Sequence, residues 1–414
     1  MRRRTFLGAM AAAGMARGLR AAPSARLTVG FLGAGNIAGY HLGPMLGQPD
    51  TQVVAVCDTR PERRAAFAQR VDQHYGAAGC AQYADFRDLL ARPDIDCVLI
   101  CTTDNWHALM AIAAAREGKH IYSEKPFALT VQEGRAMVQA VERHGVVFQH
   151  GTQQRSDSRF RQACELARNG RLGKIHTVRV AVAGGTQGTA GTPGPVPDGF
   201  DYEMWLGPAP WRPYCPERVD TSHWYFISDY SAGGYISGWG IHHVDIAQWG
   251  LGTDLTGPEW VEGTAVFPQG GLCDTPITWR AEYGFASGTR VIFTDSSQQR
   301  EGCTFEGDRG TVWVTRGAIE ADPPSLLREV IGPDEIQLYR SPEHHRNWLD
   351  CIKTGTATVT PAAVGHRSQT ICCLSDIAIR LGRRLRWDAK AERVIDDDTA
   401  NRLLTRALRQ PWTL

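Results

Sequence analysis

The stretch from Leu27 to Asp58 constrains what this chain can fold into more than any other. It reads LTVGFLGAGNIAGYHLGPMLGQPDTQVVAVCD: an apolar run, a glycine-rich turn, a helix-compatible segment, a second apolar run and an acid at its end. This order predicts a β-strand, a tight turn, an α-helix and a second strand parallel to the first. The stretch therefore predicts the first unit of a doubly wound α/β sheet.

The turn after the first predicted strand has the pattern G-x-G-x-x-A, with Gly33, Gly35 and Ala38 at its fixed positions. Gly33 permits the tight turn, Gly35 lets a pyrophosphate approach the backbone, and the small Ala38 lets helix and strand pack closely. The helix start that follows, with Asn36 and Ile37, offers free N–H groups to phosphates. The pattern predicts a dinucleotide-binding turn.

Asp58 ends the second apolar run, where a carboxylate can accept hydrogen bonds from both hydroxyls of a ribose. A carboxylate at this position favours NAD over NADP, because it repels a 2′-phosphate. Arg60 nearby leaves NADP as the less favoured alternative. We therefore expect NAD as the cofactor.

Composition excludes several classes of function. The chain has 414 residues, enough for about two domains, and 45 basic against 44 acidic side chains. This balance predicts no nucleic-acid partner, and the lack of a long apolar run predicts no membrane span. The eleven cysteines include no C-x-x-C pair, so we expect no metal site and buried free thiols.

The N-terminal segment, residues 1–26, is expected to lie outside the fold. It begins MRRRTFL, continues with a short and weakly apolar stretch, and ends in small residues. Paired arginines in this setting resemble a twin-arginine export signal, which moves folded proteins. The segment predicts a periplasmic or otherwise exported protein.

Two domains are expected after the signal. Over residues 27–150, strands alternate with helices, which predicts a Rossmann domain with a parallel sheet. Over residues 151–414, period-two alternation predicts a second α/β domain with a mostly antiparallel sheet, helices on one face of it, and a long C-terminal helix and tail. A long Gly/Pro/aromatic loop, about 184–232, interrupts this domain, and loops of that length are usually functional.

Two residues are candidates for acid–base chemistry. Lys125 follows the predicted strand 120–123, where partial desolvation would disfavour its charge and let it exchange protons near neutral pH. His242 lies on the opening turn of a predicted helix, and imidazole suits accepting a proton from a carbinol as hydride leaves. Asp245, three residues on, either orients His242 or favours the helix N-terminus. His243 is expected to point elsewhere.

These motifs resemble the glucose–fructose oxidoreductase, inositol dehydrogenase and MocA family (Gfo/Idh/MocA). The resemblance rests on GFLGAGNIAGYH at 30–41, TTDNWH at 102–107, EKP at 124–126 and GGYISGWGIHHVDIAQW at 233–249. It implies a tightly held nicotinamide cofactor between a Rossmann domain and an open-sheet domain. It also implies a sugar, glycoside or cyclitol substrate and a homo-oligomer, a dimer or tetramer.

The resemblance also implies roles for individual residues. Lys125 matches the family's active-site lysine and His242 its catalytic histidine. The expected cofactor contacts beyond the glycine turn and Asp58 are Thr102, Asn105, His107, Glu124 and Lys125. The expected substrate contacts are Arg155, Trp205, His243 and Asp245, with loop packing as the alternative for Trp205.

The chain departs from the family pattern at Gly238. The common pattern carries an aspartate four residues before the histidine, which is a proton-relay or substrate-binding carboxylate. Either another acid such as Asp229 or Asp201 replaces it, or the chemistry differs from simple alcohol oxidation.

Three hypotheses follow. The first is an NAD-dependent oxidoreductase that transfers hydride to or from a carbinol carbon of a sugar or cyclitol, with Lys125 and His242 handling the proton. The second is a redox-neutral glycoside hydrolase, lyase or epimerase that recycles tightly bound NAD. The third is a non-catalytic sugar- or dinucleotide-binding protein.

Overall fold

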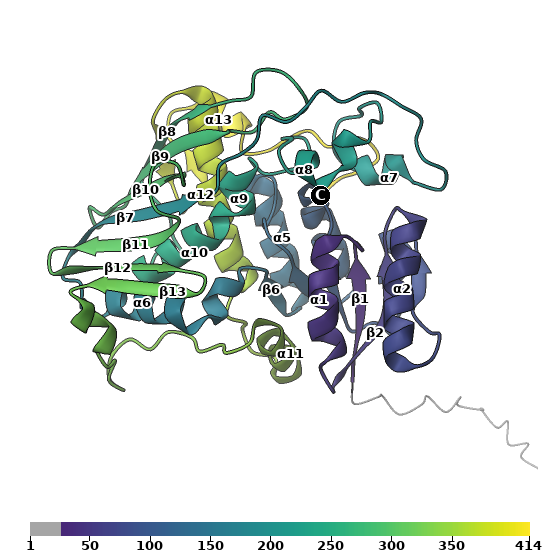
Figure 1. Cartoon of the computed structure of the whole chain (residues 1–414), viewed down its shortest axis with the longest axis horizontal. Helices are drawn as coiled ribbons and strands as arrows, with labels where there is room; N and C mark the ends of the chain where they lie inside the picture. Colours follow the sequence, from purple (N-terminus) through teal and green to yellow (C-terminus); the bar gives the residue numbers. More distant parts are fainter. Residues whose placement is uncertain (1–25) are drawn as a thin grey trace, which may run out of the picture.

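The computed structural model describes residues 26–414, so the predicted signal segment lies outside the described residues except for Arg26. The described chain forms two sheets with associated helices (Figure 1). Among the described residues, none of the helices combines the length and the apolar character needed to cross a membrane. All eleven cysteines are buried and free, as their scattered positions predicted.

The first domain is the predicted Rossmann fold. Its six strands are all parallel and follow the order β3-β2-β1-β4-β5-β6, so the order in which the chain adds strands reverses at the boundary between β1 and β4. The strands are β1 (Leu27–Leu32), β2 (Thr51–Cys57), β3 (Ala81–Tyr83), β4 (Cys97–Ile100), β5 (His120–Ser123) and β6 (Phe148–His150). Every residue of β4 is buried, as its continuous apolar run requires in a sheet covered on both faces.

The helices of this domain begin and end where local signals place them. Thr130 and Glu133 form a capping box at the start of α5, and Gly145 ends that helix with a left-handed backbone. The helices are α1 (Asn36–Leu46), α2 (Pro61–Tyr75), α3 (Phe86–Leu90), α4 (His107–Arg116) and α5 (Val131–His144).

The second domain contains a nine-stranded sheet of order β13-β12-β11-β7-β10-β9-β8-β14-β15. Only the β7–β10 pair is parallel, so the sheet is mixed and mostly antiparallel, as predicted. The strands are β7 (Ile175–Val182), β8 (Trp260–Val266), β9 (Thr278–Gly284), β10 (Arg290–Asp295), β11 (Gly302–Gly307), β12 (Gly310–Thr315), β13 (Ala318–Asp322), β14 (Leu385–Asp388) and β15 (Arg393–Val394).

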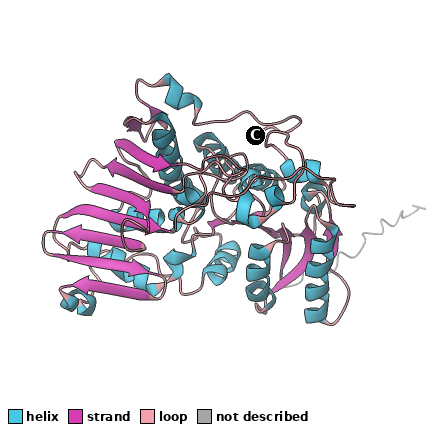
Figure 2. Ribbon diagram, turned by 45° about the horizontal axis from the view of Figure 1, so that its top comes forward, coloured by secondary structure: helices cyan, strands magenta, loops and turns pink. Residues whose placement is uncertain are grey.

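Three helices cover one face of this sheet, and Figure 2 shows the sheet and the Rossmann domain at opposite ends of the molecule. They are α6 (Ser158–Arg168), α10 (Gly240–Leu251) and α12 (Ala362–Leu381). All residues of α10 except Leu251 are buried, because the helix lies between the sheet, α6 and α12. The polar side chains of α10 are therefore held in the interior.

The loop at 184–232 reaches over the carboxyl ends of the Rossmann strands (Figure 1). Backbone hydrogen bonds tie it to the loops after β2 and β4: Asp201 N to Thr59 O at 3.2 Å, and Asn105 N to Tyr230 O at 3.2 Å. Short helices interrupt it and the segment that follows: α7 (Tyr202–Leu206), η3 (Glu217–Val219), α8 (Thr221–Trp224) and α9 (Tyr235–Gly238). The loop thus forms a roof where open α/β sheets bind ligands.

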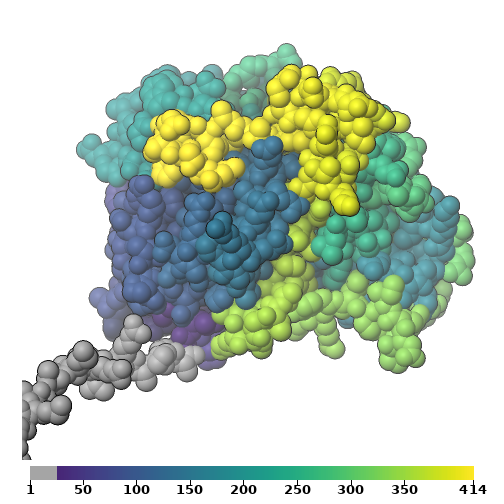
Figure 3. All heavy atoms as spheres, turned by 180° about the vertical axis from the view of Figure 1, so that it is seen from behind, coloured from purple at the N-terminus to yellow at the C-terminus, as the bar shows by residue number. Residues whose placement is uncertain are grey.

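The C-terminal part of the chain returns to the Rossmann domain. Trp348, on α11 (His344–Thr354), is fully buried in the core beneath β1 and β2. The tail, yellow in Figure 3, lies across the first domain, and Trp412 packs against Trp106 at 4.7 Å between ring centroids. The remaining short elements are η1 (Asp104–Trp106), η2 (Gln153–Ser156), η4 (Pro324–Arg328) and α13 (Asp398–Arg402).

Replacing Trp348 tests whether α11 is part of the first domain's core. Trp348→Ala removes a fully buried indole and is expected to lower the free energy of unfolding by about 3–5 kcal/mol in urea titrations. The control is Trp211→Ala, whose ring is 57% exposed and whose loss should cost less than about 1 kcal/mol. Equal small effects would show that α11 does not depend on this core.

Candidate active site

A backbone cradle lies at the switch point of the Rossmann sheet. Gly33 has φ +93°, and a Cβ built on it would overlap the carbonyl of Cys101, the residue directly after β4. The helix α1 starts directly after Gly35, with no side chain capping its first N–H groups. These groups therefore remain available to an anion, and the turn fits the pyrophosphate of a dinucleotide.

Asp58 is bonded to this turn. Its Oδ2 accepts a hydrogen bond from Ala34 N at 2.8 Å, and its Oδ1 accepts one from Arg60 N at 2.9 Å. The carboxylate is thus fixed beside the cradle at the tip of β2. The Arg60 guanidinium lies over the ring of Phe200 at 4.5 Å.

A cavity of about 220 Å³ extends from the cradle to the roof loop. It is lined by many of the residues that the sequence analysis selected, namely Gly33, Gly35, Asn36, Ile37, Asp58, Thr102, Glu124, Lys125 and Trp205. Residues outside the expected cofactor and substrate contacts also line it, among them Asp104, Trp224 and Tyr225. The cavity therefore joins the predicted cofactor turn to Lys125 and the loop.

Lys125 projects from the end of β5 into the cavity and donates a hydrogen bond from Nζ to the Tyr225 hydroxyl at 3.0 Å. Our expectation that burial lowers its pKa was wrong. Burial does act in that direction, but Tyr225, Glu124 and Asp104 outweigh it and raise the pKa of Lys125 above its usual value. Lys125 is an ammonium ion here, suited to donating hydrogen bonds and stabilising negative charge.

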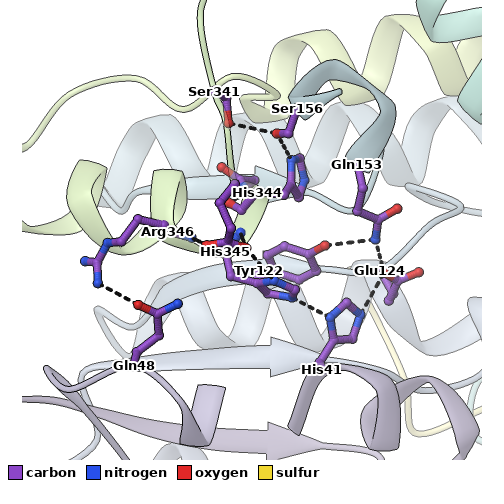
Figure 4. Close-up of polar contacts among 12 residues, drawn as sticks. His41, Gln48, Tyr122, Glu124, Gln153, Ser156, Ser341, His344, His345 and Arg346 are labelled. Carbon is purple, nitrogen blue, oxygen red and sulfur yellow. Dashed lines mark hydrogen bonds and ion pairs between the residues drawn. The ribbon is translucent and has the colours of Figure 1, made fainter. Parts of the chain in front are cut away.

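Glu124 is the centre of a buried polar network (Figure 4). Its Oε1 accepts hydrogen bonds at 2.9 Å from both His41 Nε2 and Gln153 Nε2. The other nitrogen of His41 lies 2.7 Å from His345 Nε2 on α11. Burial by itself would raise the pKa of Glu124, but His41 and Lys125 lower it to about 2, so the carboxylate stays ionised.

Asp104 is a buried carboxyl group in the cavity wall that sequence reasoning missed. It accepts a hydrogen bond from Ala232 N at 3.4 Å. Burial raises its pKa to about 7, with the Lys125 ammonium acting in the opposite direction. A carboxyl group with this pKa exchanges protons near neutral pH. In the sequence, only its place inside the TTDNWH motif at 102–107 indicated that Asp104 could belong to the site.

Asn105 and His107 lie behind the cavity wall. The Asn105 side chain donates to Leu206 O at 3.0 Å, and the His107 ring nitrogens lie 2.7 Å from Pro126 O and 3.3 Å from Thr102 O. Neither residue lines the cavity. Through these hydrogen bonds, Asn105 and His107 stabilise the segments whose residues line the cavity.

His242 is buried on the first turn of α10, and its Nδ1 has no hydrogen-bond partner among the described residues. Its ring contacts that of Trp239 at 5.2 Å between centroids. Burial, together with the charges of Arg316 and Lys125, holds its pKa well below the usual value, so the imidazole is neutral. His243 accepts a hydrogen bond at Nδ1 from Gln154 Nε2 at 3.2 Å, and neither His242 nor His243 lines the cavity.

Asp245 is paired with Arg155 in the interior of the second domain. Arg155 donates from Nε to Oδ2 at 2.6 Å and from Nη2 to Oδ1 at 2.8 Å. Ser368 donates to Oδ1 as well, at 2.8 Å. The structure therefore gives Asp245 partners other than His242, and it places both members of this pair outside the cavity lining.

The remaining candidates lie in the roof loop. Trp205 lines the cavity and is also stacked on Tyr202 at 5.9 Å, so it both packs the loop and forms a wall. Asp201 caps α7 through a hydrogen bond from Met204 N at 2.9 Å. Asp229 pairs with Arg212 at 3.2 Å. Neither acid stands in the cavity lining, so neither replaces the carboxylate that is missing at Gly238.

The glycine cradle, the fixed carboxylate and the second α/β domain together define an NAD-binding oxidoreductase. Residues 27–152 match the description "Oxidoreductase family, NAD-binding Rossmann fold", and residues 179–414 match "Oxidoreductase family, C-terminal alpha/beta domain". The chain belongs to the Gfo/Idh/MocA family of oxidoreductases.

The individual relatives described here share at most moderate sequence identity with this chain. The myo-inositol 2-dehydrogenase of Thermotoga maritima is 27% identical over 300 residues, which cover 70% of this chain and 81% of that protein. A glycosyl hydrolase family 109 protein of Shewanella pealeana is 39% identical over 119 residues, but these cover only 28% of this chain and 26% of that protein. The WlbA dehydrogenase of Bordetella pertussis, crystallised with NADH and UDP-GlcNAcA, has a TM-score of 0.65 and 21% identity over 88% of this chain and 99% of that chain. At that identity the likeness shows the fold.

Asp58→Ala is expected to weaken NAD binding by about 10–100-fold, because the cradle loses the carboxylate that accepts from Ala34 and Arg60. Quenching of tryptophan fluorescence by added NAD measures the affinity. Asp58→Asn, which keeps one acceptor oxygen, should have an NAD affinity between those of the wild type and Asp58→Ala. An unchanged affinity in Asp58→Ala would remove Asp58 from the cofactor site.

Asp104 predicts a pH dependence of stability. Its pKa is raised from 3.8 to about 7 on folding, so between these values the native state binds more protons than the unfolded chain. This contribution is complete below about pH 4 and is lost as the pH rises through 7. Asp104→Asn should therefore be more stable than the wild type at pH 8, by at most about 4 kcal/mol, with the gain vanishing towards pH 4.

Thermal and urea unfolding across this pH range provide the measurement. Asp198→Asn, at an exposed loop position, is the matched control and should follow the wild-type curve. A constant difference between Asp104→Asn and the wild type at every pH would contradict the raised pKa.

Proposed function

We propose that the protein transfers hydride between NAD and a carbinol carbon of a sugar or cyclitol. The observation that carries the proposal is the Lys125 ammonium, which projects into the same cavity as the glycine cradle. A cation beside the cofactor turn suits a neutral polyol, because it can bind a hydroxyl oxygen and stabilise charge that develops on it. The name of the Thermotoga maritima relative, a myo-inositol 2-dehydrogenase, supports the same substrate class.

The cofactor's place follows from the cradle. Gly33, Gly35 and the first turn of α1 would hold the pyrophosphate, and Asp58 the adjoining ribose. Bound there, NAD supplies the hydride acceptor and donor. Thr102 and Glu124 also line the cavity.

The protein's own residues handle the proton. Lys125 donates a hydrogen bond to the substrate oxygen and stabilises the alkoxide character that grows as hydride leaves carbon. His242 is neutral and its Nδ1 has no hydrogen-bond partner among residues 26–414, so it can accept the proton that the carbinol releases. In the reverse direction the same groups return the proton to the carbonyl oxygen.

We also propose that the cofactor is tightly bound and that the protein is exported through the twin-arginine segment to the periplasm. An exported enzyme has no obvious external supply of dinucleotide, and the signal type carries folded proteins. A dimer or tetramer would cover the sheet face opposite the helices, where Trp260 is half-buried and Val266 is 59% exposed.

A redox-neutral reaction is the second candidate. Elimination or epimerisation next to an oxidised sugar carbon needs a further acid–base group, and Asp104, with its pKa near 7, stands in the cavity wall beside Lys125. The Shewanella relative named for glycosyl hydrolase family 109 supports this class over the part of the chain that it matches. In such a cycle the hydride returns to the substrate carbon, and no net oxidation occurs.

Lys125→Met is the first test of the proposed chemistry. Turnover should fall by at least about 100-fold, since the substrate oxygen loses its charged hydrogen-bond donor, whereas NAD affinity should stay within about threefold. Lys174→Met, at an exposed position, is the control and should behave as the wild type. Near-normal turnover in Lys125→Met would contradict the mechanism.

A panel of sugars, cyclitols and glycosides, assayed with and without added NAD, separates the candidate functions. Reaction that requires added cofactor and forms NADH supports net oxidation. Turnover of glycosides without added NAD supports the redox-neutral cycle, and stoichiometric NAD released on denaturation would show that the cofactor is retained. Binding of sugars with no reaction under any condition would refute both enzymatic proposals and leave a binding protein.

A further inference from the structure

Gly238 is a glycine because of the space around it. It lies in the last turn of α9, and its backbone is not in the left-handed region that favours glycine. A Cβ built on it would overlap the hydroxyl, Cζ and Cε1 atoms of Tyr225. No larger residue can stand at position 238 while Tyr225 keeps its place.

The hydroxyl of Tyr225 thus stands where a side chain at position 238 would begin. The family pattern that the sequence resembles has an aspartate at this position, four residues before the histidine. The roof loop here brings a phenol to the same point from residue 225. A side chain at position 238 and the Tyr225 phenol would therefore compete for the same space.

The hydroxyl of Tyr225 faces the active-site lysine. It accepts a hydrogen bond from Lys125 Nζ at 3.0 Å, and Nζ lies 5.2 Å from the ring centroid, so the contact is made at the hydroxyl end of the ring. Three neighbouring rings hold the tyrosine by edge contacts at 5.2 to 5.8 Å, from Trp224, Phe226 and Tyr235. Its hydroxyl is consequently fixed, and Tyr225, Lys125 and Asp104 line one wall of the cavity.

We propose that Tyr225 is a catalytic residue that exchanges the proton with the substrate oxygen, in place of the carboxylate that Gly238 removes. This inference rests on the proposed hydride transfer, and it assigns to Tyr225, which lines the cavity, the proton exchange given above to His242, which does not. In the direction of reduction, the carbonyl carbon receives hydride from the cofactor and the carbonyl oxygen receives the Tyr225 proton. The phenolate that remains is paired with the Lys125 ammonium, and it takes the carbinol proton when the reaction runs in reverse.

The chemistry of the pair fits this assignment. Because Lys125 uses an oxygen lone pair of Tyr225, the O–H bond is free to point at a ligand in the cavity. Burial raises the pKa of Tyr225 to about 12, while Lys125 acts to lower it, so the phenol holds its proton at neutral pH. The titratable groups facing it are Lys125, Asp104 and Tyr235. A phenol donor predicts that oxidation accelerates towards alkaline pH, which a carboxylate acceptor does not.

Exchange variants test the proposal. Tyr225→Phe keeps the ring and should lose at least about 100-fold in turnover with NAD affinity within about threefold, whereas the neighbouring Tyr235→Phe should keep both. Gly238→Asp alone should lose turnover, because the new side chain would overlap Tyr225. Gly238→Asp combined with Tyr225→Ala should regain at least about tenfold over Tyr225→Ala alone, with the pH profile of oxidation moved towards acid. Turnover of Tyr225→Phe within threefold of the wild type overturns the proposal.

A second readout needs no substrate. Competitive acylation followed by peptide mass spectrometry reports the reactivity of each lysine as a function of pH in the intact protein. Without the phenol oxygen the pKa of Lys125 should fall, by about one unit, and its amine should react faster at pH 9 in Tyr225→Phe. Lys119, which donates to backbone carbonyls of Arg92 and Ile95, should be unchanged. Unchanged reactivity of Lys125 in Tyr225→Phe overturns the proposal, whether or not any sugar is turned over. Absence of sugar turnover, by contrast, would refute only the proposed function.

Discussion

The hydrogen bond between His41 and Glu124 connects the parts of the chain on which the site depends. His41 belongs to the helix that follows the glycine cradle, and Glu124 directly precedes Lys125. A buried carboxylate is costly unless it is paired and hydrogen-bonded, so the donors around Glu124 are required rather than incidental. Because His345 on α11 extends the network, the C-terminal part of the chain also helps to hold the cradle and Lys125 in one geometry.

The roof loop completes what the Rossmann sheet begins. An open parallel sheet provides a crevice at its switch point but only one wall for a ligand. The second wall comes from 184–232, which is anchored by Asn105 N on Tyr230 O and brings Trp205 and Tyr225 over the cavity. Lys125 and Tyr225 are a hundred residues apart in sequence, and their contact exists only because this loop folds back.

Sequence reasoning was strong where the determinants are short-range and weak where they are not. The strands, the capping box at Thr130 and the cradle follow from hydrophobic period and glycine geometry within a few residues. Helical spacing left two roles open for Asp245, orienting His242 or favouring the helix N-terminus. Its partner is Arg155, whose approach depends on how η2 packs against α10. Reasoning from burial alone gave the wrong direction for the pKa of Lys125, because the charges around it come from other segments.

The sequence by itself determined the order of strands and helices, the dinucleotide turn and the family, since each rests on spacing and residue type along the chain. It also marked the departure at Gly238. Only the tertiary structure decided what stands opposite that glycine, which acid carries a pKa near 7, and which histidine lies against Glu124. The physical reason is that side-chain partners and local dielectric depend on packing between distant segments, whereas turns, caps and strand periodicity are set by neighbours in sequence.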